Sequence, residues 1–202
     1  MTRRRSRLHA PAAPLLGALL CLLAPACIDL EPKEGPQIRW IRLGDLEPAR
    51  RSELAAPEQP RLQLERVEAS DGLTDQLKTR RTEFEVTYEE LVRWTEPPQD
   101  VVQRALEAEL FRSRGFERAT TPPRRRLRVT VLAFEETLVP RHEGIVRLSV
   151  RLVDPSRDTI LLDRVLEGRE PIDGDDAALV AEALTVALRS VVTELSDLVA
   201  TR

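Results

Sequence analysis

The residue with the clearest chemical context in the sequence is Cys27, which ends an apolar run. Residues 15–27 read LLGALLCLLAPAC, and four arginines precede them within residues 3–7. A positively charged segment, a short apolar run and small residues before a cleavage point form the order of a secretory signal. The run is too short to span a membrane, because a spanning helix needs about 20 apolar residues. We therefore expect cleavage at Cys27.

The five residues Leu23-Ala24-Pro25-Ala26-Cys27 resemble the lipobox of bacterial lipoproteins. In those proteins the cysteine thiol receives a diacylglyceryl group, becomes the first residue of the mature chain and is then acylated on its amine, for instance with palmitate. One acyl chain binds a membrane only marginally, but two or more hold firmly, because each buried CH2 contributes about 0.8 kcal/mol. The motif therefore predicts a lipoprotein signal peptide over residues 1–26 and a lipidation site at Cys27.

The sequence leaves two alternatives to lipidation open. An ordinary secretory signal would leave Cys27 as a free thiol, and Arg3-Arg4-Arg5 could begin a twin-arginine export signal, although the rest of that motif is absent. Two positions inside the motif also depart from the usual lipobox: Ala24 stands where leucine is usual, and Pro25 is an unusual residue at its position. Cys21 is the weaker candidate for acylation, because the large Leu20 precedes it.

Composition narrows the classes of function that are compatible with the mature chain. Residues 1–26 carry four arginines and no acidic residue, so the 176 mature residues keep 27 basic and 34 acidic side chains, a net charge of −7. This balance argues against nucleic acid as a partner. Both cysteines, Cys21 and Cys27, lie in the signal region, so the mature chain has no disulfide and must be stabilised by packing.

The mature chain lacks the residues that most enzymes and metal sites use. His142 is its single histidine and lies in a predicted turn, where we expect a solvated surface residue rather than a general base. One histidine and no cysteine pair exclude the common transition-metal sites. The adjacent acidic pairs Glu89-Glu90 and Glu135-Glu136 point to opposite faces of a strand, and we interpret them as solvated edges. We therefore expect no catalytic residue, no metal and no cofactor.

The rest of the chain divides into a tether and a single domain. Residues 27–37 are polar and contain prolines, which is typical of a spacer, and residues 38–202 have the length of one globular domain. Apolar and polar residues alternate in several segments, which predicts strands. The expected strands cover residues 38–44, 62–71, 84–94, 116–119, 126–133, 146–152 and 160–167. Short, turn-rich connections between the last three predict an antiparallel meander.

Two amphipathic helices complete the predicted domain. One spans 97–114 and is followed by Gly115, which favours the left-handed conformation at a helix end. The other spans about 175–200 with an apolar stripe at helical spacing. We interpret the acidic run 173–176 as the start of this helix rather than as a calcium loop. The predicted fold is α+β, a mostly antiparallel sheet with both helices packed on one face.

The remaining polar and aromatic features are interpreted as structural rather than functional. Asp45 to Pro60 is charged and contains prolines, so we expect a loop, and residues 73–82 show no pattern of a regular element. The basic residues Arg124-Arg125-Arg126 and Arg128 are interpreted as the charged start of a strand, with contact to anionic lipid headgroups as the alternative. Trp94 is expected to fix the end of its strand onto the helix that follows.

Residues 84–116 read FEVTYEELVRWTEPPQDVVQRALEAELFRSRGF. The distinctive features of this segment are a strand containing Tyr88, the pair Arg93-Trp94, the acidic Glu96, Pro97-Pro98 and a helix with Leu106 and Leu110. These features resemble the ABC-type transport auxiliary lipoprotein family, the PqiC-like group that accompanies MCE-type lipid transporters of double-membraned bacteria. The likeness extends over the mature chain, but Asp45 to Pro60 has no counterpart in the family pattern.

The resemblance implies a non-enzymatic, lipid-anchored protein on the periplasmic side of the cell envelope. It would act with the MCE-domain and ABC transporter subunits of a system that moves phospholipid or another hydrophobic cargo between membranes. Phospholipid binding and self-association as a homo-oligomer are both compatible with that role. Ile28 after Cys27 favours the outer membrane under the enterobacterial sorting rule. The alternative is an outer-membrane lipoprotein that assembles or regulates another envelope machine, such as a secretion channel or a cell-wall synthase.

Overall fold

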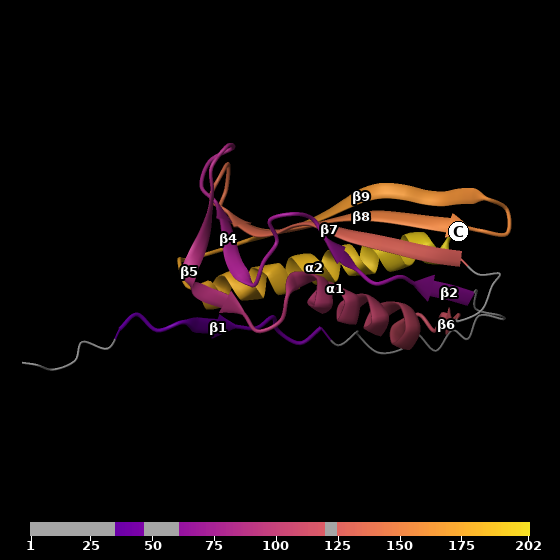
Figure 1. The fold of residues 1–202 in the computed structure, drawn as a ribbon, viewed down its shortest axis with the longest axis horizontal. Coiled ribbons are helices and arrows are strands. Elements are labelled where there is room, and N and C mark those ends of the chain that lie inside the picture. The colour runs from indigo at the N-terminus through magenta and orange to yellow at the C-terminus, as the bar shows by residue number, and fades with distance from the viewer. Residues whose placement is uncertain (1–34, 47–60, 120–124) are drawn as a thin grey trace, which may run out of the picture. The chain divides into compact units, whose positions relative to one another are not determined.

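Strand β7 (Arg125–Thr137) is the centre of the sheet, because other strands pair with it along both edges. The computed structural model describes residues 35–46, 61–119 and 125–202, and these contain a nine-stranded sheet (Figure 1). The sheet and its helices belong to one compact unit, Pro36–Arg202.

On one edge, β7 pairs antiparallel with β8 (Glu143–Asp154), and β8 pairs antiparallel with β9 (Thr159–Pro171). The connections are short, so each strand folds directly back on the one before it. The predicted meander of the last three strands is confirmed.

The remaining strands lie toward the other edge of β7. They are β1 (Arg39–Ile41), β2 (Arg61–Leu64), β3 (Glu68–Ala69), β4 (Gln76–Arg80), β5 (Val86–Trp94) and β6 (Glu117–Arg118). β2, β3 and β4 each pair parallel with β7, one after another along its length. β4 pairs antiparallel with β5, while β5 pairs parallel with β1 and β2 pairs parallel with β6.

The expectation of a mostly antiparallel sheet is wrong, and the sheet is mixed. Within the described residues, five strand pairings are parallel and three are antiparallel. Alternation of apolar residues identifies the two faces of a strand but carries no information about its direction. The direction of β7 depends instead on the helical connection between β5 and β6. This connection brings the chain back so that β7 runs parallel to β2, β3 and β4.

The two helices are α1 (Pro98–Glu107) and α2 (Ala177–Ala200), and both contact β7. A π-helical turn over Ala108–Ser113 continues α1, and Gly115 follows with φ of 76°. The Asp176 carboxylate caps α2 by accepting a hydrogen bond from the Ala178 N–H at 3.0 Å. Both predicted helices and their end signals are confirmed. Among the residues described, no helix combines the length and apolar character needed to cross a membrane.

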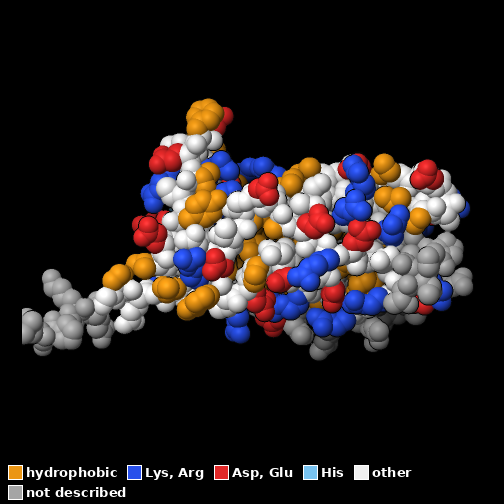
Figure 2. All heavy atoms as spheres, viewed as in Figure 1, with side chains coloured by type: hydrophobic (Ala, Val, Ile, Leu, Met, Phe, Trp, Pro, Cys, Tyr) orange, Lys and Arg blue, Asp and Glu red, His pale blue; other side chains and the backbone are white. Residues whose placement is uncertain are grey.

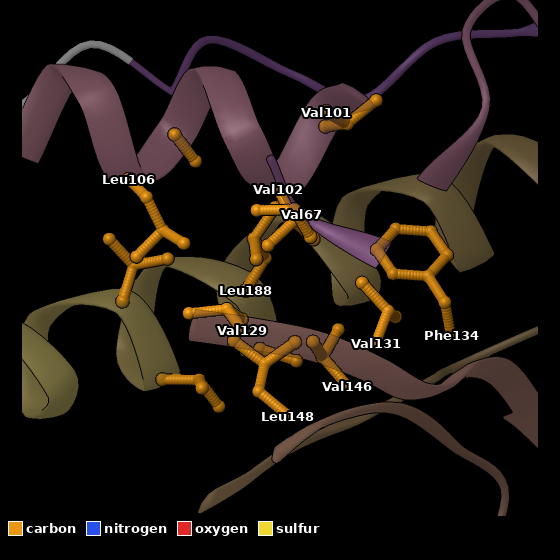
Figure 3. Close-up of a cluster of buried hydrophobic side chains, with 14 of the residues drawn as sticks. Val67, Val101, Val102, Leu106, Val129, Val131, Phe134, Val146, Leu148 and Leu188 are labelled. Carbon is orange, nitrogen blue, oxygen red and sulfur yellow. The ribbon is translucent and has the colours of Figure 1, made fainter. Parts of the chain in front are cut away.

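The hydrophobic core lies between the helices and the sheet (Figure 3). Val102 and Leu106 of α1 and Leu188 of α2 meet side chains of β7 and β8, and all three are fully buried. Burying one such side chain contributes about 1.5–3 kcal/mol relative to leaving it in water. The strand side chains labelled in this cluster are Val129, Val131, Phe134, Val146 and Leu148.

Several element boundaries differ from the sequence prediction. The strand expected over residues 62–71 is two short strands, β2 and β3, and β7, β8 and β9 are longer than expected. β4 lies inside residues 73–82, where no element was expected, because its polar side chains conceal the alternation around the buried Leu77. β5 begins at Val86, which places Phe84 in the preceding turn rather than in the strand. Cys27 and residues 47–60 of the expected loop lie outside the described residues.

Helix α2 approaches β9 most closely at Gly168. A Cβ atom at this position would lie 2.3 Å from the Ala187 carbonyl oxygen and 2.7 Å from a methyl carbon of Val191. The backbone of α2 therefore rests directly on the glycine, and the separation of helix and sheet is set by the absence of a side chain there.

We expect Gly168→Ala to lower the free energy of unfolding by about 1–3 kcal/mol, because α2 must move away from the sheet to admit the methyl group. Thermal melting measures this as a lower Tm. Gly35→Ala is the control, since nothing lies within 4 Å of a Cβ at that position. A Gly168→Ala protein that melts like the wild type would contradict the close packing of α2 on β9.

Candidate docking surface

The β4–β5 hairpin rises from one end of the sheet, together with the turn between β7 and β8 (Figure 1). The Leu138 N–H donates a hydrogen bond to the Arg80 carbonyl oxygen at 2.9 Å, which joins the turn to the hairpin. We call residues 76–91 and 138–142 the projection. Its outer end is formed by residues 81–85 between the two strands.

The outer end of the projection presents an aromatic ring to solvent. Phe84 is 92% exposed. The turn that carries it is ordered by hydrogen bonds, since the Thr82 hydroxyl oxygen accepts from the Glu85 N–H at 3.0 Å and the Arg81 N–H donates to the Glu85 carbonyl oxygen at 3.0 Å. The ring is therefore presented to solvent by an ordered turn, where a partner could cover it.

Further apolar side chains extend this surface along the projection (Figure 2). The exposed ones are Tyr88, Leu91, Leu138 and Val139. Acidic residues flank the tip, because Glu83 and Glu85 are both exposed on either side of Phe84. The surface is therefore apolar at its centre with charges of both signs around it, since Arg81 and Arg141 are exposed as well.

A buried ion cluster fixes the base of the projection on one face of the sheet. The Glu135 carboxylate on β7 is only 3% exposed and lies 2.8 Å from Lys78 Nζ. Arg80 Nε donates to the same carboxylate at 2.8 Å, and both cations come from β4. One buried acid therefore holds two residues of the hairpin, and removing it would leave two cations without their partner.

The opposite face of the sheet has a second connection, made by Glu136. Its carboxylate accepts a hydrogen bond from the Thr79 hydroxyl at 2.7 Å and lies 2.6 Å from His142 Nε2. Glu136 thus links β4, β7 and the turn before β8. The interpretation of Glu135-Glu136 as a solvated edge is wrong, and His142 is half-buried against a carboxylate rather than a solvated turn residue. The two acids do point to opposite faces, as expected.

Ion pairs continue from the projection across β8 and β9. Arg169 lies 3.1 Å from the buried Glu143 and donates to Glu167 at 2.6 Å, and Arg147 also pairs with Glu167. Burial raises the pKa of Glu167, but the hydrogen bonds from Arg169 and Arg147 outweigh it, so this pKa lies below its ordinary value. These pairs brace the start of β8, from which the turn of the projection emerges.

The other residues singled out in the sequence have structural positions. Trp94 is 4% exposed and meets Phe134 of β7 edge-to-face with ring centroids 5.4 Å apart, so it packs the end of β5 on β7; its expected role in fixing this end onto α1 stays a prediction. Arg128 pairs with Glu65 at 2.9 Å. Asp176 caps α2, as the helix interpretation of the acidic run requires. Cys27 lies outside the described residues, so the structure places no lipidation site.

The sequence from residue 43 to residue 196 matches the family model for the ABC-type transport auxiliary lipoprotein component. This match covers most of the chain and includes α1, most of α2 and the projection. The chain belongs to this family. No curated protein sequence matches the chain. The family membership confirms the resemblance drawn from residues 84–116 and assigns the protein to the auxiliary lipoprotein components of ABC-type transport.

Solved structures share the fold of this family member. Protein XCC0632 from Xanthomonas campestris is 18% identical with a TM-score of 0.70, and the alignment covers 81% of this chain and 96% of that one. The hypothetical protein CT253 from Chlamydia trachomatis is 11% identical with a TM-score of 0.52, covering 72% of this chain and 100% of that one. At these identities the likeness supports the fold alone.

The family-like segment, residues 84–116, contains the tip of the projection, all of β5 and α1. Sequence reasoning found this segment but missed two of its properties. Phe84 lies in the turn before β5 rather than in the predicted strand, and β4 with its two cations lies where the sequence predicts no regular element. The available signal was the spacing of Lys78 and Arg80, which places both side chains on one face of a strand around the buried Thr79.

We expect Glu135→Ala to lower the free energy of unfolding by about 3–5 kcal/mol, because Lys78 and Arg80 lose their shared buried partner. Chemical denaturation followed by circular dichroism measures the change. Glu83→Ala removes an exposed carboxylate from the same projection and should leave stability within about 0.5 kcal/mol of the wild type. Equal stability of the two variants would show that the buried cluster does not hold the hairpin.

Proposed function

We propose that this protein is a lipid-anchored periplasmic subunit that docks through its projection onto an MCE-type ABC transporter carrying phospholipid or another hydrophobic cargo between envelope membranes. The lipid is attached to Cys27, and the outer membrane is the proposed address. The role is non-enzymatic, so energy comes from separate ATPase subunits. The observation that carries the docking proposal is the exposure of Phe84 on a hairpin fixed by buried ion pairs.

Family membership supports the transporter as the partner. An auxiliary component acts by contacting other subunits, so it needs a surface that is stable before the partner arrives. Rigid presentation of an apolar anchor lowers the ordering cost of binding. The projection meets this requirement because Glu135 and Glu136 fasten its base on both faces of the sheet.

The charge of the tip indicates the chemistry of the site on the transporter. Glu83 and Glu85 flank Phe84 directly, and Arg81, the next charged residue of the turn, is already paired with Glu89 at 3.4 Å. A protein pocket that is apolar inside and rimmed by lysine or arginine would accept the ring and pair with both carboxylates. We therefore propose a protein partner for the projection.

The interactions of His142 support a non-enzymatic role. Its Nε2 atom is engaged with Glu136, and the Thr79 hydroxyl donates to that same carboxylate rather than to the imidazole. The three side chains form a link between strands. Such an arrangement gives no activated hydroxyl for covalent catalysis.

We expect Phe84→Ser to reduce recovery of transporter subunits by roughly thirtyfold, the effect of losing about 2 kcal/mol at an interface anchor. The measurement is affinity capture of the tagged, membrane-extracted lipoprotein followed by quantitative mass spectrometry. Val165→Ser is the matched control, because Val165 is an exposed apolar residue on β9, away from the projection.

Three results are informative in this capture experiment. Loss of an MCE-domain subunit with Phe84→Ser alone supports the proposal. Equal recovery with both variants would place the interface elsewhere on the protein. Recovery of secretin or cell-wall synthesis components from the wild type would favour the alternative, a lipoprotein that assembles another envelope machine.

We expect Cys27→Ser to accumulate as the full-length precursor without acyl chains, because the thiol is the proposed acceptor of the diacylglyceryl group. Intact-mass spectrometry and membrane fractionation measure retention of residues 1–26 and loss of lipid. Cys21→Ser is the matched control and should mature normally. Normal maturation of Cys27→Ser would rule out the lipid anchor.

A further inference from the structure

The outward face of β1 exposes the largest apolar side chain near the start of the domain. Trp40 is 61% exposed and Ile38 is 50% exposed, whereas Ile41 and Leu43 face the core and are buried. Hydrophobic side chains gather over β1 in Figure 2. Ile38 and Arg42, which flank β1 on either side, are exposed like Trp40. We call these three residues the β1 face.

The β1 face is held rigidly. Trp40 pairs with Arg93 of β5 in the sheet, and the Gly44 N–H donates to the Thr185 hydroxyl oxygen of α2 at 2.9 Å. Arg39 lies 2.8 Å from the Asp176 carboxylate. The hydrogen bond from Ala178 and then this guanidinium lower the pKa of Asp176, so the pair stays ionised at neutral pH. The exposure of Trp40 is therefore a property of the folded domain.

Leaving such side chains in water has a cost. Full burial of a large apolar side chain contributes about 1.5–3 kcal/mol, and the β1 face forgoes much of that in the free protein. The exposure is confined to particular residues of this segment, because Ile41 and Leu43 are buried in the core. A partner that covers Ile38 and Trp40 would recover the difference.

The distance from the lipidation site indicates what that partner is. Ten residues, 28–37, separate Cys27 from Ile38. Fully extended, this connection spans at most about 40 Å, so an acylated Cys27 keeps the β1 face close to the bilayer at all times. Tethering of this kind gives a high effective concentration of membrane at the face, and weak contacts are then sufficient.

The chemistry of the β1 face matches a membrane interface. Tryptophan favours the headgroup region, where its ring is buried and its N–H stays hydrated, and an arginine beside it can pair with lipid phosphates. Arg42 makes no ion pair within the part of the chain that the structure describes.

We infer that Ile38, Trp40 and Arg42 contact the phospholipid surface in which Cys27 is anchored, and that this second contact fixes the orientation of the domain on the membrane. The inference rests on the proposed lipid anchor at Cys27. It adds a site of interfacial insertion whose ligand is a bilayer containing anionic phospholipid. The projection is then presented at a set angle rather than on a freely rotating tether.

Tryptophan fluorescence tests this inference without altering the core. The chain has two tryptophans, and Trp94 is buried while Trp40 is exposed. The acylated full-length mature protein is reconstituted into phosphatidylethanolamine–phosphatidylglycerol vesicles, with and without bromine-labelled acyl chains. We expect a shift of emission to shorter wavelength on reconstitution and a loss of intensity with brominated lipid. Trp40→Phe should abolish both changes, because only Trp94 then remains.

Flotation of the same vesicles separates failure of the inference from failure of the anchor. Protein that floats with the vesicles while its emission is neither shifted nor quenched would overturn the membrane contact and leave the anchor intact. Protein that does not float would overturn the anchor at Cys27 and the inference with it. A shift that requires added transporter subunits would show that the β1 face binds protein, which also overturns the inference.

Discussion

The structure depends on the pairing of β7 along both of its edges. One edge forms the local meander with β8 and β9, and the other receives β2, β3 and β4 in succession. The register of β7 with β8 shifts between Val131 and Ala133. Before the shift, β7 supplies apolar side chains to the helices; after it, Phe134 still packs in the core, but the next two residues are Glu135 and Glu136. The same strand therefore builds the core and then the base of the projection.

The charged residues at that base have a positional role. Buried ion pairs contribute little net stability compared with apolar packing, since desolvation of the charges offsets their attraction. These ion pairs specify the position of β4. The buried Glu135 carboxylate is neutralised only when β4 lies where Lys78 and Arg80 can reach it. The projection and the β1 face are then two separate exposed apolar surfaces, one with two carboxylates beside Phe84 and the other with an arginine near Trp40.

Sequence reasoning found what depends on local pattern. The meander, both helices, Gly115 at a helix end and the capping Asp176 follow from periodicity and end signals within a few residues. What depends on distant partners was not found. The parallel pairing of β2 to β4 with β7 joins residues such as Leu62 and Arg125, and no local signal encodes it. The burial of Glu135 depends on Lys78 and Arg80, which are distant in the sequence. The alternating pattern of residues 84–88 predicts a strand and does not reveal that Phe84 lies in a turn.

The parallel edge has a consequence for the order in which the domain can form. β2, β3 and β4 all precede β7 in the chain, so folding from the N-terminus includes an interval in which they lack the strand that completes them. Such unpaired strands are prone to wrong association. Lys78 and Arg80 keep β4 charged and hydrated during that interval, and only β7 brings the carboxylate that neutralises them. The residues that fix the hairpin in the finished domain are thus also suited to protect it from other chains beforehand.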